Sequence, residues 1–426
     1  MNFLNNLPLL GFLLLNIGVA LFAFFRSPVK KFSVYAGGSA NVSKITLIMT
    51  LLATLFSGVE FGYLNFILRH GLIYIIRAFL VVIAILFATT LLIPSLVRET
   101  KALTIGEIMC KAYGPWMQII TGSCVFLLSF IAFKSNVNIM LRVGTDLLDL
   151  ANPRLPKNTA TLFTILGLVV ALVYLLGGMK TMYYGHTLQM SVGILLFIVL
   201  FTKMYSLVGG FGMVWKYLPE RKSILLDNPD LYPFIRDHIF TIPFFILSVV
   251  VAILPKVAFV EKERKIKSVA WVSVLYIIGM LILIFLGLGE RLLSEKLGIK
   301  GQDISFFTIV INMFNTREGL IIQCLSIGIM GILLSTIDTY LHVATLAIMT
   351  DIIDPLRTLM GKHPLSEKKK LMTARTVALC VAFTFFGMVF YFKFSNVIYS
   401  YLFWIICLMA IIILSLLTVI LLEEKK

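Results

Sequence analysis

The stretch GILLSTIDTYLHVATLAIMTDII, residues 331–353, is apolar enough to cross a bilayer, yet hydroxyl, carboxyl and imidazole side chains recur along it. A polar or ionisable group at bilayer depth is costly, and such groups face other protein or a water-filled cavity rather than lipid. The stretch therefore predicts a helix packed among others, with a polar face that carries a function.

The composition of the whole chain indicates a polytopic, all-α membrane protein. The chain has 426 residues, a mean hydropathy of +0.98 and 59% hydrophobic residues, whereas a soluble domain is about half apolar. Many apolar runs reach the roughly 20 residues that a spanning helix needs. Because the runs are continuous, they exclude a transmembrane β-barrel, whose strands alternate over about ten residues.

Eleven apolar runs are candidates for membrane spans, and they make residues 1–426 a single transmembrane domain. The runs lie at roughly 7–25, 43–68, 71–95, 116–148, 158–177, 186–207, 239–255, 268–289, 318–349, 373–392 and 396–422.

The distribution of basic residues predicts the orientation. The formal charge of +16 needs no nucleic-acid partner, because Lys and Arg gather in the cytoplasmic loops of membrane proteins. No basic residue precedes the first run, and the three densest basic clusters (26–31, 260–267 and 366–370) then fall on one side. We expect a multi-pass protein of the plasma (bacterial inner) membrane, with the N-terminus outside and the C-terminus in the cytoplasm.

Several classes of function are disfavoured by the sequence. The five cysteines form no CxxC or Cys/His pair, which predicts neither disulfides nor a thiolate metal site. The sequence contains no Walker motif, no attached soluble domain and no catalytic dyad with metal-like His/Asp spacing. We therefore expect neither ATP-driven transport nor enzyme activity, and no organic cofactor.

The second run contains an interruption and an acid. Ser57 and Gly58 weaken a helix in mid-membrane, and a break there frees carbonyls that are tolerated only beside a cavity or an ion. The alternative is a glycine used for close helix packing. Glu60 favours the break, because a carboxylate inside a span costs on the order of 2.5–3.5 kcal/mol on insertion scales.

The ninth run carries the adjacent hydroxyls of Ser335 and Thr336, one turn after Ile332. Sodium is a hard cation that prefers oxygen, and two hydroxyls with carbonyls from a broken helix would make a small neutral cage. Alternatively, each hydroxyl bonds a carbonyl one turn back in its own helix. The residues alone leave both interpretations open.

Five segments, in order along the chain, resemble motifs of the sodium:solute symporters, the carriers of proline, sugars, sialic acid and pantothenate. FSVYAGGSANVSKITLIMTLLATLFSG (32–58) resembles the Y-x-x-x-G-x-S entry to the first core helix. LTIGEIMCKAYG (103–114) is similar to T-x-x-E-x-x-x-x-R-Y-G, and LLGGMKTMYYGHTLQ (175–189) to GG-x-K-x-x-x-x-T-D-x-x-Q. PKVAFVEKERKIK (255–267) is similar to QR-x-x-A-A-K-x-x-K-x-A-R, and 331–353 to A-x-x-S-(S/T)-x-D-S-x-L-N-x-x-S-T-x-x-x-x-D-I.

The resemblance spans nearly the whole chain and implies the LeuT-type fold. In that fold one extra helix precedes a ten-helix core of two inverted five-helix repeats. Residues 1–41 would hold the extra helix and a loop, 42–208 the first repeat and 237–422 the second. The first helix of each repeat is expected to be broken, at Ser57-Gly58 and at Pro243.

The resemblance also implies an ion site between the second and ninth runs. Backbone oxygens of Ala53, Phe56 and Ile332 would hold sodium together with the Ser335 and Thr336 hydroxyls.

A substrate site is implied beside the ion site. Glu60 falls where relatives place a substrate-contacting polar residue, and Ser57, Gly58, Lys134 and Asn138 are further candidates. Lys134 either faces Glu60 across the cavity or neutralises another acid. Glu60 favours a cationic, zwitterionic or polyhydroxyl solute, and Lys134 would reverse that preference.

Two departures from the family pattern bear on ion coupling. Leu55 stands where some relatives carry Asp or Asn, and Gly185-His186 stands where the family has Thr-Asp. A neutral His is a poor sodium ligand but carries a proton near its ordinary pKa of about 6.5. We expect no second sodium at this position. His186 with Asp338 is a candidate proton or second-ion site, and the alternative is a hydrogen-bonded His at the cytoplasmic end of its span.

The expected function is sodium-coupled symport of a small polar organic solute by alternating access. The expected partners are the solute, the sodium ion and the lipid bilayer. A proton-coupled symporter of the same fold and a non-transporting solute sensor are the alternatives. The sequence indicates neither the identity of the solute nor the oligomeric state.

Overall fold

The computed structural model describes residues 7–26, 28–38, 41–57, 73–99, 102–143, 159–217, 239, 241–296, 319–390 and 396–423. Within these ranges every regular element is a helix. In chain order the elements are α1 (Leu7–Arg26), α2 (Phe32–Gly37), α3 (Lys44–Leu55), α5 (Ile73–Leu86), η2 (Phe87–Leu92), α6 (Ile93–Glu99), α7 (Ile105–Tyr113), α8 (Pro115–Val143), α10 (Thr159–Gly177), α11 (Met179–Val208), α12 (Phe211–Tyr217), α14 (Ile242–Val257), α15 (Lys262–Lys296), α17 (Gly319–Leu346), η5 (Ala347–Ile353), α18 (Asp354–Leu359), α19 (Glu367–Phe390) and α20 (Asn396–Glu423).

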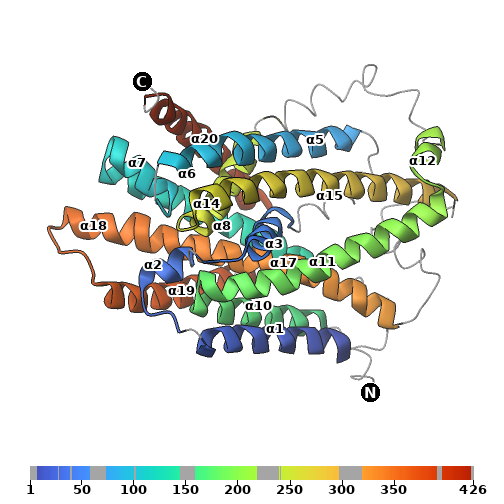
Figure 1. Ribbon diagram of the computed structural model, residues 1–426, viewed down its shortest axis with the longest axis horizontal. Helices are drawn as coiled ribbons and strands as arrows, with labels where there is room; N and C mark the ends of the chain where they lie inside the picture. Colours follow the sequence, from blue (N-terminus) through green and yellow to red (C-terminus); the bar gives the residue numbers. More distant parts are fainter. Residues whose placement is uncertain are drawn as a thin grey trace.

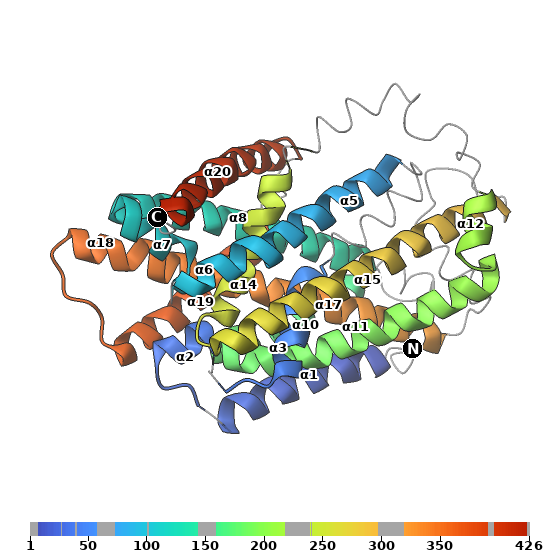
Figure 2. The same cartoon turned by 45° about the horizontal axis from the view of Figure 1, so that its top comes forward.

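Apolar helices occupy all eleven predicted spans. Among the described residues, eight helices are long and apolar enough to cross a membrane, and three shorter apolar helices lie within the second, fifth and seventh spans. The elements run broadly along one direction, with α2, α7 and α18 at one end and α12 at the other (Figures 1 and 2). We call these ends the α7 end and the α12 end.

The structure differs from the predicted spans at several helix boundaries. Gly178 has φ +75, which ends α10, and α11 begins at once at Met179, seven residues before the predicted start. His186 therefore lies two turns inside α11 and is fully buried, not at a span end. The short helices α7 and α12 lie outside the eleven predicted spans.

The helix that we expected to break at Ser57-Gly58 ends just before that point, and residues 58–72 lie outside the described residues. The Ser43 hydroxyl caps α3 by accepting from Thr46 N at 3.1 Å, and the helix ends at Leu55. Phe56 is extended (φ −80, ψ 123), so the chain leaves helical geometry just before Ser57. In the seventh span, α14 starts with a proline in its first turn, at Pro243. The division into two inverted repeats stays a prediction.

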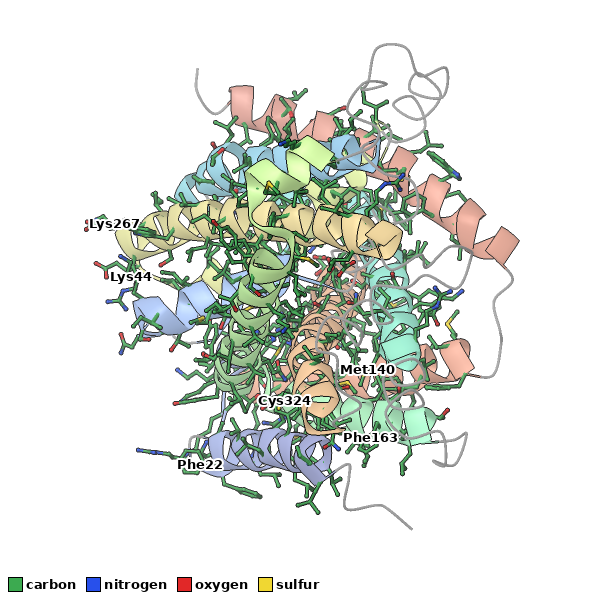
Figure 3. The ribbon with its side chains drawn as sticks, turned by 90° about the vertical axis from the view of Figure 1, so that its right-hand side faces the viewer. Phe22, Lys44, Met140, Phe163, Lys267 and Cys324 are labelled. Carbon is green, nitrogen blue, oxygen red and sulfur yellow. The ribbon has the colours of Figure 1, made fainter. Side chains whose placement is uncertain are left out.

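α17 lies at the centre of the bundle. Within its continuation to Leu359, 89% of the most apolar window is buried, against at most 56% for the other long apolar helices. It packs against α8, α10, α11 and α19, and Figure 3 shows it enclosed when the bundle is viewed from the α12 end. The polar stretch 331–353 is therefore covered by protein, as its composition predicts.

The first helix is attached to the core by a buried polar network. The Asn16 side-chain oxygen accepts from Gln189 Nε2 at 3.0 Å, and the Tyr174 hydroxyl donates to the Asn16 carbonyl at 3.0 Å. Asn16 Nδ2 donates to Phe12 O of its own helix at 2.9 Å. Because these groups lie on α1, α10 and α11, the network fixes α1 against the core.

The close approach of α11 to α17 depends on Gly193. A Cβ added there would lie 2.7 Å from Ile332 Cγ1. We expect Gly193→Ala to lower the free energy of unfolding by about 1–3 kcal/mol, because the extra methyl overpacks the contact. A denaturant titration in detergent micelles measures the loss.

Gly387→Ala is the matched control for this substitution. Gly387 lies within α19 and has no atom within 4 Å of an added Cβ. Alanine there should be neutral or stabilise by up to about 1 kcal/mol, from helix propensity. Equal behaviour of the two variants would contradict the packing role of Gly193.

Candidate ion site

Five oxygen atoms from α17 and the end of α3 converge in the core. Ser335 Oγ lies 3.1 Å from Ala53 O and 2.7 Å from Ile332 O. Thr336 Oγ1 lies 3.2 Å from Phe56 O and 3.2 Å from Ile332 O. All five residues are buried. We call this set of atoms the five-oxygen cluster.

The five-oxygen cluster has more acceptors than hydrogens. Its three carbonyls are acceptors only, and each of its two hydroxyls has a single hydrogen to donate. The helix ends at Leu55, so the Ala53 carbonyl belongs to the last turn, whose acceptors have no partner further along the helix. Uncharged oxygens with spare lone pairs suit a hard monovalent cation.

Both sequence interpretations of the hydroxyls hold in part. Ser335 and Thr336 do reach the Ile332 carbonyl of their own helix, as Ser and Thr in membrane helices often do. They also reach carbonyls of α3, which are about 280 residues away in the chain. The second contact is the one that an isolated Ser-Thr pair would not make.

A buried histidine–aspartate pair lies one turn further along α17. His186 Nε2 of α11 is 2.7 Å from Asp338 Oδ1, and both side chains are 0% exposed. The predicted partnership of these two residues is therefore present in space. Within the described residues, Asp338 Oδ2 and His186 Nδ1 have no hydrogen-bond partner.

Lys256 lies beside this pair, where the sequence did not place it. It follows the end of the seventh predicted span, at residue 255, but it occupies the last turn of α14 and is 1% exposed. Its Nζ donates to the Thr54 hydroxyl and, at 2.9 Å, to the Thr339 hydroxyl. The only sequence signal is that Lys256 directly follows an unbroken apolar run, 242–255.

The α7 end of the bundle is closed around α2. His342 Nε2 lies 2.9 Å from Ala36 O, and the Tyr183 hydroxyl donates to Lys256 O at 3.0 Å and to Gly37 O at 3.4 Å. The Tyr35 and His342 rings pack with centroids 5.4 Å apart. These contacts join α2 to α11, α14 and α17 at the α7 end of the bundle.

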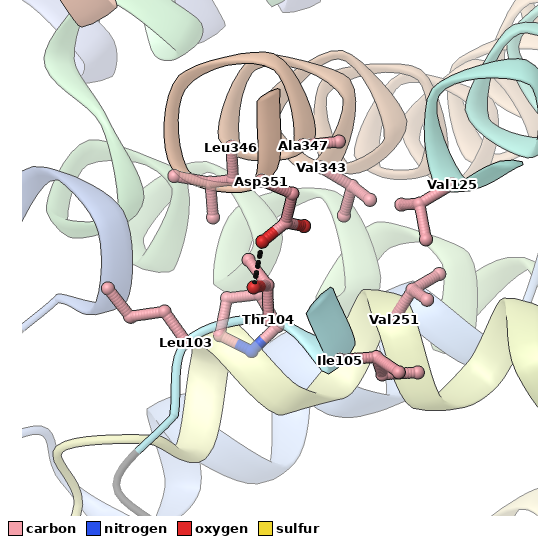
Figure 4. Close-up of a pocket in the computed structure, with 10 residues that line it drawn as sticks. Leu103, Thr104, Ile105, Val125, Val251, Val343, Leu346, Ala347 and Asp351 are labelled. Carbon is pink, nitrogen blue, oxygen red and sulfur yellow. Dashed lines mark hydrogen bonds between the residues drawn. The ribbon is translucent and has the colours of Figure 1, made fainter. Parts of the chain in front are cut away.

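The last acid of the stretch 331–353, Asp351, connects η5 to the start of α7 through a hydrogen bond. The Thr104 hydroxyl lies 2.5 Å from Asp351 Oδ1 (Figure 4). Gln118 Nε2 of α8 lies 3.1 Å from Thr350 O. Asp351 borders a cavity of about 10 Å³, close to the smallest space that holds a water molecule. Asp351 therefore belongs to a helix junction, 13 residues beyond Asp338, and not to the ion cluster.

Thr104 also caps α7, with Glu107 completing a capping box. Thr104 Oγ1 accepts from Glu107 N at 3.1 Å, and Glu107 Oε2 accepts from Leu103 N at 2.7 Å. Burial raises the pKa of the Glu107 carboxyl above its ordinary value, and the Leu103 N–H opposes that shift. The Thr104 hydroxyl takes part in both the capping box and the contact with Asp351. Thr104 therefore connects the start of α7 to η5.

We expect Thr104→Val to cost about 2–3 kcal/mol of unfolding free energy, because both the α7 cap and the donor to buried Asp351 disappear. Ser43→Ala removes the cap of α3 and an exposed hydrogen bond to the Thr46 hydroxyl, and it should cost about 1 kcal/mol. Thr104→Ser keeps the hydroxyl and should stay close to the parent protein. Denaturant titration of the three variants checks the order, and a Thr104→Val loss no larger than that of Ser43→Ala would contradict it.

The candidate substrate residues are only partly described. Ser57 is half-buried beyond the end of α3, whereas Gly58 and Glu60 lie outside the described residues. On α8, Lys134 is buried and Asn138, one turn later, is exposed. Their predicted contacts with a solute stay predictions.

Comparison of the sequence with protein-family models and with curated proteins gives no match. Among solved structures, the chain is similar to the substrate-bound outward-open state of a Na+-coupled sialic acid symporter, with TM-score 0.76 and 15% identity over 96% of this chain and 84% of that one. It is also similar to MhsT in complex with L-phenylalanine, with TM-score 0.59 and 16% identity over 87% and 88% of the two chains. These likenesses confirm the predicted LeuT-type fold.

Proposed function

We propose that the chain is a sodium-coupled secondary active transporter of a small polar organic solute. The observation that carries the proposal is the five-oxygen cluster, in which every residue predicted to hold sodium contributes an oxygen. Two solved structures of the same fold support it, one of them a Na+-coupled sialic acid symporter. The sodium:solute symporter family is the assignment that the sequence motifs favour.

The position of the cluster explains how an ion would act on the conformation. Its ligands come from two elements, the end of α3 with Phe56 that follows it, and the continuous α17, so a bound sodium ion joins them. An ion that needs both elements binds best to the state in which they are together, and it shifts the population toward that state. Sodium would thereby hold the end of α3 in place, next to the expected solute site at Ser57.

Alternating access requires the closed α7 end to open. We infer that the α7 end faces the cytoplasm, because the basic clusters at 260–267 and 366–370 flank its helices. The contacts of Ala36 and Gly37 with His342 and Tyr183 would break in the inward-open state. Solute and sodium would then leave past α2.

Proton coupling is a second candidate, because of one specific observation. His186 and Asp338 form a fully buried pair beside the ion cluster, and a histidine changes charge near neutral pH when its surroundings allow. Such a transporter would keep the fold and use this pair as its coupling site. Exchange of sodium for potassium in the binding assay separates the two candidates.

The test is a thermal-stability titration of the purified protein with sodium and, separately, with potassium. A ligand that binds only the folded state raises the melting temperature by mass action. We expect sodium to stabilise and potassium not to, and a solute screen in sodium should then show further, sodium-dependent shifts. Counterflow of a solute identified in this way, in proteoliposomes, demonstrates transport.

Three results would redirect the assignment. Equal shifts with sodium and potassium overturn sodium coupling and favour the His186–Asp338 pair. Solute binding without counterflow identifies a sensor. If neither sodium nor potassium changes the melting temperature, the five-oxygen cluster no longer supports the proposal.

A further inference from the structure

The buried ammonium of Lys256 occupies a position between the same two helices that form the five-oxygen cluster. Its two hydroxyl partners are Thr54 of α3 and Thr339 of α17. Thr54 directly follows Ala53, and Thr339 donates its own hydrogen to the Ser335 carbonyl at 2.7 Å. Both partners are thus attached to residues of the five-oxygen cluster.

The two hydroxyls are oriented as acceptors. Thr54 Oγ1 donates to Thr50 O at 2.8 Å and Thr339 Oγ1 to Ser335 O at 2.7 Å. A hydroxyl has one hydrogen, so each can offer only lone pairs to a further partner. Oxygen lone pairs from two helices, aimed at one point, make a site for a cation or a donor, and Lys256 Nζ fills it.

Charge balance at this point comes from Asp338. Asp338 Oδ1 lies 2.7 Å from His186 Nε2, and its second oxygen, Oδ2, has no hydrogen-bond partner among the described residues. Further along α17, the Tyr340 hydroxyl contacts the Ser248 hydroxyl, and His342 Nε2 is engaged by Ala36 O. Asp338 and Lys256 are thus buried groups of opposite charge type in one region of the core, and a buried charge is retained when it is compensated.

We propose that Lys256 supplies a built-in second cation, so that the protein binds a single sodium ion, in the five-oxygen cluster. The ammonium takes the inner cation position formed by the Thr54 and Thr339 hydroxyls and balanced by Asp338. This inference rests on the proposed sodium site and adds its stoichiometry. It also gives the substitution of His186 for the family's Asp a physical reason, since a second inner carboxylate would have no mobile cation to hold.

The first measurement is the number of sodium ions bound per chain, by equilibrium dialysis of the wild-type protein with radioactive sodium. We expect one. Two bound ions would overturn the inference and leave the proposed function standing, whereas no bound ion would overturn the proposed sodium site itself.

The second measurement uses Lys256→Ala. This substitution removes the ammonium and keeps the Thr54 and Thr339 hydroxyls that accept from it. We expect a second sodium ion to enter, so that the Hill coefficient of the sodium-dependent stabilisation rises from about 1 toward 2. Methylammonium at constant sodium should occupy the same space and return the coefficient toward about 1. A one-ion curve that methylammonium does not affect would overturn the inference.

Two controls separate this role from general stability. Lys256→Arg keeps a permanent cation and should keep the one-ion curve. Lys267→Met removes a lysine that is exposed and paired with Glu263 on α15, and it should also leave the curve unchanged. If Lys256→Ala folds only when methylammonium is present, that rescue itself supports the inference; if neither condition yields folded protein, the wild-type stoichiometry decides.

Discussion

Sodium-dependent stabilisation is expected to disappear in the double variant Ser335→Ala/Thr336→Ala. The variant loses two of the five oxygens and both hydroxyls that connect α17 to the end of α3. At a sodium concentration 100 times the dissociation constant, the wild type gains about 2.7 kcal/mol. A 100-fold loss of affinity would leave about 0.4 kcal/mol of that gain.

The matched control removes two hydroxyls elsewhere. Ser415 and Thr418 on α20 are exposed and bond only carbonyls of their own helix, at 2.8 Å each. Ser415→Ala/Thr418→Ala should therefore keep the full sodium response, measured as the shift in melting temperature between sodium and potassium. A normal response in the Ser335/Thr336 variant would place the ion elsewhere.

The second large effect is expected when Asp338 is changed. Asp338→Asn should lower the free energy of unfolding by about 3–5 kcal/mol, because the Lys256 ammonium loses its compensating charge in the interior. Asp338→Asn/Lys256→Met removes both charges and should recover most of the loss. Denaturant titration in micelles, run as a double-mutant cycle, measures the coupling between the two side chains.

Asp354→Asn serves as the control for this prediction. Asp354 pairs with Lys370 where both side chains are partly exposed, at 28% and 19%, and such pairs contribute about 0–1 kcal/mol. Additive losses in the Asp338 and Lys256 variants would show that the two charges do not compensate each other.

The sequence could predict the fold and the five-oxygen cluster because both leave local patterns. Apolar run lengths locate the helices, and Ser335-Thr336 and Ser57-Gly58 are short signals within single runs. Helix boundaries were less predictable than helix positions. Lys180, for example, lies in the first turn of α11, although a charged residue before an apolar run was assigned to the preceding loop. α7 was missed because a nine-residue capped helix carries too few apolar residues to stand out.

Lys256 could not be assigned from its neighbours in the sequence. A lysine at the end of an apolar run, followed by charged residues, ordinarily marks the water interface. What keeps it buried is supplied by Thr54 and Thr339, 202 and 83 residues away. The His186–Asp338 contact likewise spans 152 residues, so only the packing of α11 on α17 reveals it.

The attachment of α1 has a consequence for synthesis. Asn16 enters the membrane first, while its partners Tyr174 and Gln189 follow 158 and 173 residues later. At about 5–20 residues per second, translation delays them by roughly 8–35 s. During that wait the amide of Asn16 can already donate to Phe12 O within its own helix. The nascent helix is therefore able to reside in lipid with one exposed acceptor, and its docking must follow completion of α11.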